Sequence, residues 1–597
     1  MKSGGTAAFW KGPRQMPITD LLERNHKLYG GETALVEINP EIQEKHRVTW
    51  KEYELIEPAS TVPYRREITW GVFDEKANRV ANMLLSRGVK KGDKVAILLM
   101  NCLEWLPIYF GILKAGAVAV PLNFRYTAQE IDYCLKKADV DVLFFGPEFI
   151  GRVEDIVPKI SSQMLLFFVG DTCPSFAEDY HRATANCSSA APKVLVDDED
   201  DAAIYYSSGT TGFPKAILLR HQCLLQSARM EAIHHETTHE DVFLCIPPLY
   251  HTGAKMHWFG SLFTGSRAVL LKGNSPQAIF DAVSGEKCTI VWLLVPWCQD
   301  ILAALDRGDL KIENYQLSQW RLMHIGAQPV PPSPIRHWMK YFPHHKYDTN
   351  YGLSESTGPG CVHLGMDHIH KVGAIGVPGY GWKVKIVDEQ GQTVPQGEVG
   401  ELCVKGPGVM KCYYHDPEAT AAVLQNGWLY TGDIAYMDEE GYFYIVDRKK
   451  DLIIVGGYNV YPREIDEVLH THPKIREAVT VGVNHRSRGE TVKAYIVPEE
   501  GANLTVPEVV AFCRQKLASF KVPRLIEFRE ELPKTMVGKV LRRILREEEL
   551  QKSDTEQDKE QLVPEETSKE EVSAPEAGIG EKEAKTQGEP EKTDGNA

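Results

Sequence analysis

The chemistry of this chain is most apparent in a polar loop sequence at residues 206–215, Y-S-S-G-T-T-G-F-P-K. Its two glycines allow positive-φ backbone that turns successive N–H groups toward an anion, and its hydroxyls and lysine add donors and charge. The better-known phosphate loop places lysine directly after a glycine, whereas Phe213 and Pro214 intervene here. We therefore predict a triphosphate-binding loop formed by Ser207, Ser208, Gly209, Thr210, Thr211, Gly212 and Lys215.

Short apolar segments flank this loop on both sides. Residues 202–206 and 216–219 carry the aromatic and β-branched side chains that are typical of strands. The loop should therefore join two strands and leave its amides free to bind an anion. A plain hydroxyl-rich turn would need fewer glycines, hydroxyls and charges.

Six further segments combine glycine, polar and charged residues. In chain order they read G-A-Q-P at 326–329, Y-G-L-S-E at 351–355, Y-T-G-D at 430–433, D-R-K-K-D at 447–451, G-G-Y-N at 456–459 and P-K-T-M-V-G-K at 533–539. Each is weak evidence by itself, because an aspartate after T-G is usually a turn and a charge run is usually a solvated face. In this order, together with the phosphate loop, they resemble the adenylate-forming (AMP-binding) superfamily over roughly residues 15–545. That superfamily includes acyl- and aryl-CoA synthetases, luciferases and peptide-synthetase adenylation domains.

The resemblance implies a role for each segment. Tyr351 would stack on adenine, and Glu355 with Thr210 would hold Mg²⁺, a hard cation that prefers oxygen ligands. Asp433 would accept hydrogen bonds from both ribose hydroxyls, and Arg448 would reach the ribose or a phosphate. Besides the phosphate loop, the implied nucleotide-binding residues are Gly326, Ala327, Gln328, Tyr351, Gly352, Ser354, Glu355, Asp433 and Arg448.

The C-terminal segments imply a catalytic lysine and a moving domain. Lys539 matches the family lysine that bridges the acyl carboxylate and the α-phosphate, where a fixed cation offsets the charge of two anions. Lys450 takes the hinge position, and Gly456 and Gly457 would line the tunnel for the pantetheine arm of coenzyme A. We expect ATP, Mg²⁺ and coenzyme A to take part in two successive half-reactions, joined by rotation of the small domain.

The expected fold is α/β, with a large multi-subdomain N-terminal domain of layered β-sheets and helices and a small mobile α/β C-terminal domain. The large domain should span residues 1–449 and the small one 450–545. Strand-like and helical patterns alternate along both, as layered α/β proteins require. Strands are predicted at 94–100, 142–145, 164–169, 242–246, 478–483 and 493–497, and helices at 222–233, 462–469 and 506–517.

The segment near His251 indicates which kind of acid the pocket would accept. P-L-Y-H-T-G at 248–253 resembles the family's acyl-pocket mouth, where His251 would be either an aromatic gate beside the carboxylate or a structural histidine. No aspartate is available nearby to hold an ammonium group, which disfavours an amino acid. Trp258, Trp297 and residues 358–362 would line the tail of a medium-length, alicyclic or aromatic acid. Transfer of the acyl group to a carrier protein is the alternative, and reverse operation to make ATP also stays open.

A second motif is typical of a different class of enzyme. His235-Glu236-Thr237-Thr238-His239 satisfies H-E-x-x-H, the signature of zinc hydrolases, in which two histidines on one helix share a metal. The run falls where the preceding helical pattern should end, and no third histidine of the longer signature follows. We therefore treat a zinc metallohydrolase as the remote alternative.

Length and composition fit a globular enzyme. With 597 residues, 43% of them hydrophobic, the chain can bury a large core in more than one domain. Residues 95–122 are apolar but interrupted by Glu104 and Lys114, which predicts strand, buried helix and strand and no transmembrane segment. The 12 cysteines form no C-x-x-C and the first 17 residues lack an apolar leader core, so we expect a cytoplasmic enzyme. We expect it to be a monomer or a homodimer. Basic and aromatic residues do not cluster as nucleic-acid binding requires.

Two segments depart from the family pattern. Residues 48–69 contain two candidate entries to the first helix, at 48–50 and 68–70, and we expect an insertion that forms a surface excursion. Residues 546–597 should form a disordered acidic tail, since 551–597 hold 14 Asp and Glu against 6 Lys and no aromatic residue.

Overall fold

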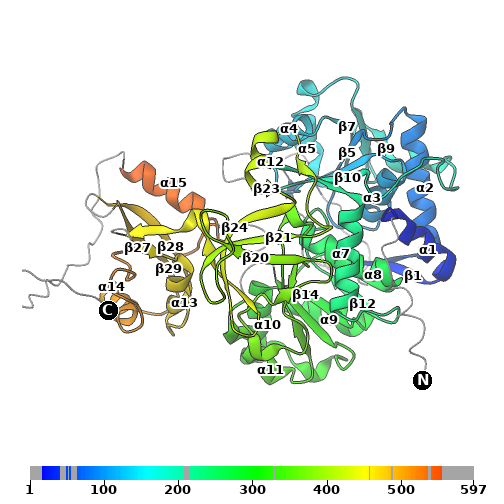
Figure 1. The fold of residues 1–597 in the computed structure, drawn as a ribbon. Coiled ribbons are helices and arrows are strands. Elements are labelled where there is room, and N and C mark those ends of the chain that lie inside the picture. Colours follow the sequence, from blue (N-terminus) through cyan, green and yellow to red (C-terminus); the bar gives the residue numbers. More distant parts are fainter. Residues whose placement is uncertain are drawn as a thin grey trace, which may run out of the picture.

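The computed structural model describes residues 16–39, 49–50, 53–54, 64–207, 214–326, 330–358, 360–455, 458–485, 489–534 and 540–553. The chain forms two large sheets, whose strands are interleaved in the sequence, an antiparallel sheet and a small C-terminal unit (Figure 1). The predicted α/β class is confirmed.

The first large sheet supplies the floor of the candidate site. Its seven strands lie in the order β16-β15-β14-β12-β13-β1-β4, and all neighbours pair in parallel except β1 with β4. Parallel strands buried on both faces read as continuous apolar runs, and I-V-W-L-L of β14 is such a run. The strands are β1 (Thr33–Asn39), β4 (Tyr64–Thr69), β12 (Val242–Cys245), β13 (Arg267–Leu271), β14 (Ile290–Leu294), β15 (Leu322–Gly326) and β16 (Lys346–Asp348).

The second large sheet carries the phosphate loop. Its eight strands lie in the order β22-β11-β10-β6-β5-β7-β8-β9, and the β10–β11 and β11–β22 pairs are antiparallel. The predicted strands on either side of the loop are thus confirmed as neighbours. The strands are β5 (Lys94–Leu98), β6 (Val118–Pro121), β7 (Val140–Phe145), β8 (Leu165–Phe168), β9 (Glu178–Asp179), β10 (Asp201–Tyr206), β11 (Ala216–Arg220) and β22 (Cys412–Tyr413).

Helices cover these sheets and fill the space between them. The helices α7 and α8 pack on each other in the middle of the large part of the molecule, with α7 contacting β11 of one sheet and α8 contacting β12 of the other (Figure 1). Every residue of α3 is buried, and Gly111 lets α3 approach Val80 of α2 closely. The helices are α1 (Thr19–Tyr29), α2 (Trp70–Ser86), α3 (Trp105–Lys114), α4 (Ala128–Lys137), α5 (Ile150–Glu154), α6 (Tyr180–Ala185), α7 (His221–His234), α8 (Thr252–Thr264), α9 (Pro276–Glu286), α10 (Val295–Arg307), α11 (Pro332–Tyr341) and α12 (Pro417–Val423).

Antiparallel strands then lead toward the C-terminal unit. A five-stranded sheet contains β20 (Lys383–Val387), β21 (Gly400–Lys405), β23 (Leu424–Gln425), β24 (Trp428–Met437) and β25 (Phe443–Arg448). A small sheet of β17 (Asn350–Tyr351), β18 (Val362–His363) and β19 (Val377–Pro378) lies beyond β16 in the sequence. After the short 3-10 helix η7 (Lys449–Asp451), a final sheet begins.

That final sheet forms the C-terminal unit, which stands to one side of the large part in Figure 1. Separate apolar clusters, one containing Ile465 and Val509 and the other Tyr495 and Leu545, give it a core of its own. The helix predicted at 506–517 ends earlier, at Arg514. The elements are β26 (Ile453–Val455), β27 (Tyr458–Val460), α13 (Pro462–His470), β28 (Ile475–His485), β29 (Gly489–Pro498), α14 (Val506–Arg514), β30 (Leu525–Phe528) and α15 (Arg542–Ser553).

The expected surface excursion at 48–69 needs correction at its C-terminal end. Tyr64–Thr69 is a strand of the first sheet, paired antiparallel with β1, and Thr69 caps α2 by accepting the Val72 amide at 3.2 Å. Of the two candidate entries to a helix, the second therefore enters α2, and Thr49–Trp50 lies in the short strand β2, which pairs with β3 (Tyr53–Glu54). No helix among the described residues is long and apolar enough to cross a membrane. The acidic tail lies outside the described residues.

Gly376 offers a test of this architecture. Its φ is +112°, and a Cβ there would lie 1.8 Å from the carbonyl oxygen of His363. Gly376→Ala should lower stability by about 3 kcal/mol or more, because both the backbone conformation and the contact forbid a side chain. Thermal unfolding checks this. Gly285→Ala, in α9 with nothing within 4 Å of the added Cβ, is the matched control and should unfold close to the wild type. Equal melting temperatures for the two variants would contradict the packing described.

Candidate active site

The phosphate loop spans the turn between β10 and β11. The Ser207 amide donates to the Lys215 carbonyl at 3.1 Å, which closes the base of the loop. Residues 208–213, with Ser208, Gly209, Thr210, Thr211 and Gly212, lie outside the described residues. The structure therefore fixes where the loop begins and ends.

A tyrosine that sequence reasoning missed joins this loop to the Y-G-L-S-E segment. The ammonium of Lys215 lies 4.7 Å from the ring centre of Tyr413, and the Tyr413 hydroxyl donates to Glu355 Oε1 at 2.9 Å. Tyr413 belongs to β22, which pairs with β11 beside the loop. Burial, followed by the charge of Glu355, raises the pKa of this phenol, so it stays protonated and donates. Tyr413 thus contacts both Lys215 of the loop and Glu355, the carboxylate predicted to bind the metal.

Three more predicted residues meet at a second junction. The Tyr351 hydroxyl donates to Asp433 Oδ2, and Arg448 Nε lies 2.6 Å from Asp433 Oδ1. Asp433 and Arg448 face each other across the β24–β25 pair, and Asp433 is 3% exposed. The charge-assisted bonds hold this carboxylate in one orientation.

The glycine turn follows the carboxyl end of β15. Gly326 is the last residue of that strand, and a Cβ on it would lie 3.8 Å from the indole nitrogen of Trp292. Gly352 follows β17, and the Ser354 hydroxyl lies 3.1 Å from the Thr252 hydroxyl on α8. Ala327 and Gln328 lie outside the described residues.

His251 lies at the start of α8. Its Nδ1 accepts the Gly253 amide at 3.1 Å, so the neutral ring carries its proton on Nε2. Burial, with the neighbouring His257 and Lys255, lowers its pKa to about 4, and the ring is neutral at pH 7. The hydrogen bond to Gly253 gives this ring a structural role as the cap of α8, and the aromatic gate stays a prediction.

The H-E-x-x-H interpretation fails on helix geometry. The helix α7 ends at His234, and Glu236 takes a positive φ of 48° that breaks the helical spacing. His235 Nε2 lies 2.9 Å from Asp348, whereas His239 stacks on Tyr29. The two histidines therefore cannot share a metal in the manner of zinc hydrolases.

The predicted tail pocket also needs correction. Trp258 is fully buried against Phe73 and Phe110 of α2 and α3, because it lies about 100° around α8 from His257. Trp297 is 9% exposed on the first turn of α10, and Gly358 approaches Met256 and Thr252 of α8. Among the predicted lining, Trp258 belongs to the core and is not part of a pocket wall.

The predicted hinge residue, Lys450, follows Arg448 by two positions. Lys450 is exposed in η7, and its carbonyl accepts from Arg546 of α15 at 3.0 Å. Gly456, Gly457 and Lys539 lie outside the described residues, so their placement stays a prediction.

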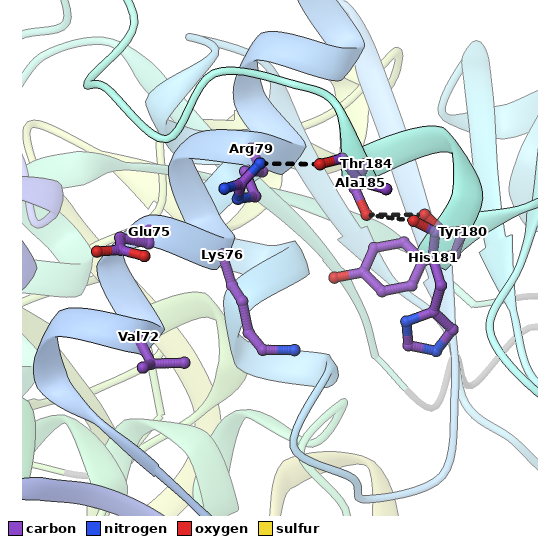
Figure 2. A pocket seen from close by; sticks show the side chains of 8 residues that line it. All are labelled: Val72, Glu75, Lys76, Arg79, Tyr180, His181, Thr184 and Ala185. Carbon is purple, nitrogen blue, oxygen red and sulfur yellow. Dashed lines mark hydrogen bonds between the residues drawn. The ribbon is translucent and has the colours of Figure 1, made fainter.

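A cavity of ≈ 290 Å³ elsewhere contains none of the predicted site residues. It lies between α2 and α6, where Arg79 donates to the Ala185 carbonyl (Figure 2). Its lining includes Lys76 and His181 but none of the segments discussed above.

Comparison with known proteins decides the family. The model of the AMP-binding enzyme family matches residues 43–414, and that of the AMP-binding enzyme C-terminal domain matches residues 464–539. The chain is an AMP-binding enzyme of the adenylate-forming superfamily. It belongs to the acyl- and aryl-CoA synthetase branch, whose members are AMP-forming acid–thiol ligases.

Relatives of this AMP-binding enzyme cover most of its length. It is 36% identical to a long-chain-fatty-acid–CoA ligase of Bacillus subtilis (strain 168), across 81% of this chain and 91% of that one. It is 34% identical to a feruloyl-CoA synthase of Amycolatopsis sp, across 80% and 92%.

Solved structures agree with this assignment. The anthranilate CoA ligase AuaEII in complex with anthranoyl-AMP superposes with a TM-score of 0.79 at 26% identity, covering 91% of this chain and 99% of that one. ATP-bound MatB from Rhodopseudomonas palustris gives 0.78 at 28% identity, covering 89% and 99%. The layered fold expected from the sequence is therefore the fold of adenylate-forming enzymes.

Tyr413 gives a test of the site. Tyr413→Phe keeps the ring beside Lys215 but removes the hydrogen bond to Glu355. A hydrogen bond to a charged group contributes about 1.5–3 kcal/mol, so acid-dependent pyrophosphate release should fall by about tenfold or more and require more Mg²⁺. The control is Tyr414→Phe, whose hydroxyl donates to Asp139 at the surface instead. If both variants keep wild-type rates and Mg²⁺ dependence, Tyr413 does not position Glu355.

Proposed function

We propose that this enzyme is an ATP- and Mg²⁺-dependent carboxylic acid:CoA ligase that makes an acyl adenylate and pyrophosphate, and then acyl-CoA and AMP. The observation that carries the proposal is the junction of Tyr351, Asp433 and Arg448 together with the Lys215–Tyr413–Glu355 link. All of these residues except Tyr413 come from the segments that match the family motifs. The names of the relatives, which act on fatty, ferulic and anthranilic acids, support a carboxylic acid as the substrate.

The nucleotide would bind across these two groups. Asp433 would accept the ribose hydroxyls, since each carboxylate oxygen has two lone pairs and Tyr351 and Arg448 use one on each. The Tyr351 ring would stack on adenine. Lys215 and the donors of the phosphate loop would neutralise the β- and γ-phosphates.

The residues present also fit Mg²⁺. Glu355 offers carboxylate oxygens, and Tyr413, whose ring contacts Lys215, holds Oε1 in place. We propose Glu355 and Thr210 as the protein groups that hold the ion. When bound, Mg²⁺ would supply charge neutralisation of the phosphates as pyrophosphate leaves.

In the first half-reaction, the carboxylate oxygen of the acid attacks the α-phosphorus, and the bond from that phosphorus to the pyrophosphate oxygen breaks. Two anions approach each other in this step, so a fixed cation lowers the barrier. We assign this role to Lys539. His251, neutral and with Nε2–H available, would orient the carboxylate.

In the second half-reaction, the thiolate of coenzyme A attacks the acyl carbon, and the bond to the AMP oxygen breaks. We propose that the unit after Lys450 rotates between the two steps, bringing Gly456 and Gly457 to the pantetheine arm. The domain boundaries 1–449, 450–545 and 546–597 are proposed on the same basis. Because an enzyme lowers one barrier in both directions, ATP formation from acyl-CoA, AMP and pyrophosphate is part of the same proposal.

The acid that we propose is medium-length, alicyclic or aromatic. The acyl acceptor distinguishes the main function from the alternative. A coenzyme A-dependent release of AMP supports the ligase, whereas adenylation that proceeds without any thioester on coenzyme A favours transfer to a carrier protein.

Lys539→Ala tests the proposed chemistry. Pyrophosphate release across a panel of aliphatic, alicyclic and aromatic acids should fall at least about 100-fold, because the variant loses the cation at the α-phosphate. Conversion of a supplied acyl adenylate to acyl-CoA should fall much less. The control is Lys516→Ala, which removes a surface lysine of the same unit that donates to Thr471. Unchanged pyrophosphate release in Lys539→Ala would refute the role given to this lysine.

A further inference from the structure

Buried polar side chains from α7, α8 and β15 converge beside the first sheet. His324 lies in the middle of β15, and the centre of its ring is 4.4 Å from that of His257 on α8. Glu231 of α7 has Oε1 3.8 Å from His257 Nε2. One ligand atom from each of the three residues lies within 4.8 Å of the other two, and the residues are 0%, 3% and 2% exposed in the order given. We call Glu231, His257 and His324 the buried triad.

The hydrogen bonds of His257 turn a lone pair toward Glu231. His257 Nδ1 donates to the Gly253 carbonyl one turn earlier on α8, and a carbonyl only accepts, so the neutral ring carries its proton on Nδ1. Stacking on Trp292, at 4.7 Å and 25°, holds the ring in this orientation. The lone pair of Nε2 then faces Glu231 Oε1 across 3.8 Å. Two acceptors that face each other in a buried site repel unless a cation lies between them.

His324 adds two further unpaired atoms. Both of its ring nitrogens lack a hydrogen-bond partner among the residues that the structure describes, although the side chain is fully buried. Buried polar groups in native proteins are almost always paired. A proton on His257 Nε2 would satisfy Glu231 but leave His324 without a partner, whereas a metal ion accepts a lone pair from all three residues at once. The triad is therefore matched to a metal ion better than to a proton.

The carboxylate of the triad is also held from its other side. Glu231 Oε2 lies 3.2 Å from Nδ1 of His235, and Nε2 of the same histidine lies 2.9 Å from Asp348. His235 therefore keeps Oε1 of Glu231 directed at the triad. Protein metal ligands are commonly oriented in this way, by hydrogen bonds on the side that faces away from the ion. The Gly253 carbonyl does the same for His257.

A fourth polar group closes the site. The side-chain amide of Asn350, at the start of β17, lies 3.3 Å from His257 Nε2 and 3.4 Å from Glu231 Oε1. Half a turn of this amide about its last torsion directs Oδ1 to the same point. Two imidazoles and two oxygens suit tetrahedral zinc, whose ligand atoms stand about 3.4 Å apart. An iron site of two histidines and one carboxylate keeps open positions, whereas a structural zinc site has four protein ligands.

A second cluster of histidines and a carboxylate is already paired. His235 Nε2 and His363 Nδ1 lie 2.9 Å and 3.2 Å from the same oxygen of Asp348, and the Gly365 amide donates to the other oxygen at 2.8 Å. These residues would have to give up their hydrogen bonds to bind an ion. The second cluster therefore serves as the control for the buried triad.

We propose that the buried triad holds a structural zinc ion. The ligands are Glu231 Oε1, His257 Nε2, one ring nitrogen of His324 and Oδ1 of Asn350. The ion joins α7 and α8 to β15, the strand that ends at the glycine turn. It is distinct from the Mg²⁺ proposed at Glu355 and takes no part in either half-reaction, so the inference does not rest on the proposed function.

The metal content of the purified, tag-free enzyme tests the proposal. Elemental analysis after dialysis into metal-free buffer should find about one zinc ion per chain. Removal of zinc by a strong chelator should lower the melting temperature by at least about 5 °C, and ZnCl₂ should restore it, because an ion that binds only the folded chain stabilises it. Metal-free enzyme that neither binds added Zn²⁺ nor gains thermal stability from it would overturn the inference.

Matched variants locate the ion. His324→Leu should reduce the bound zinc at least about tenfold, because it removes a ligand. His363→Leu, which removes a similarly buried histidine of the second cluster, should keep the wild-type zinc content. Zinc that is lost in His363→Leu and kept in His324→Leu would place the ion in the second cluster and overturn the assignment.

Anomalous diffraction at the zinc edge from crystals of the wild type decides the matter if His324→Leu does not fold. The account expects an anomalous peak about 2.0–2.1 Å from His257 Nε2 and from one ring nitrogen of His324. A peak between Asp348 and His363, or no peak in crystals grown with ZnCl₂, would contradict the assignment.

Discussion

The parallel register of β14, β15 and β16 is the constraint on which the site depends. It brings the carboxyl ends of these strands to one edge, where the glycine turn and Tyr351 follow, and it fixes which side chains face α7 and α8. Because side chains alternate along a strand, a slip of one residue would turn His324 and Asp348 to the other face and replace them with apolar neighbours. The position of the glycine turn and of Tyr351 therefore depends on the pairing of these strands.

Little backbone separates the residues proposed to bind the nucleotide from the proposed hinge at Lys450. Asp433 is held by Tyr351 and Arg448, and η7 with Lys450 begins directly after Arg448. A nucleotide bound as proposed would share the Asp433 carboxylate with Tyr351 and Arg448. Arg546 of the C-terminal unit donates to the Lys450 carbonyl, so the segment about which we propose that this unit turns lies two residues from Arg448. We propose that motion of the C-terminal unit and nucleotide binding are coupled through these short, charged contacts.

Sequence reasoning predicted correctly those features that depend on short contiguous segments. The strands around the phosphate loop, the buried helix α3 and the family were all predicted, because turn chemistry and apolar periodicity act locally. Tyr413 was missed because it lies about 200 residues from Lys215 and is one of two adjacent tyrosines, which only the β11–β22 pairing distinguishes. Trp258 was predicted to line the acid pocket but faces the core, because the sequence does not show which side of α8 faces the sheet. The zinc site at H-E-x-x-H was wrong because the helix ends before Glu236.

The most direct measurement is a crystal structure of the enzyme with a sulfamoyl analogue of an acyl adenylate. The account predicts adenine against Tyr351 and the ribose hydroxyls within about 3.2 Å of the Asp433 carboxylate. A nucleotide bound away from Tyr351 and Asp433 would contradict it.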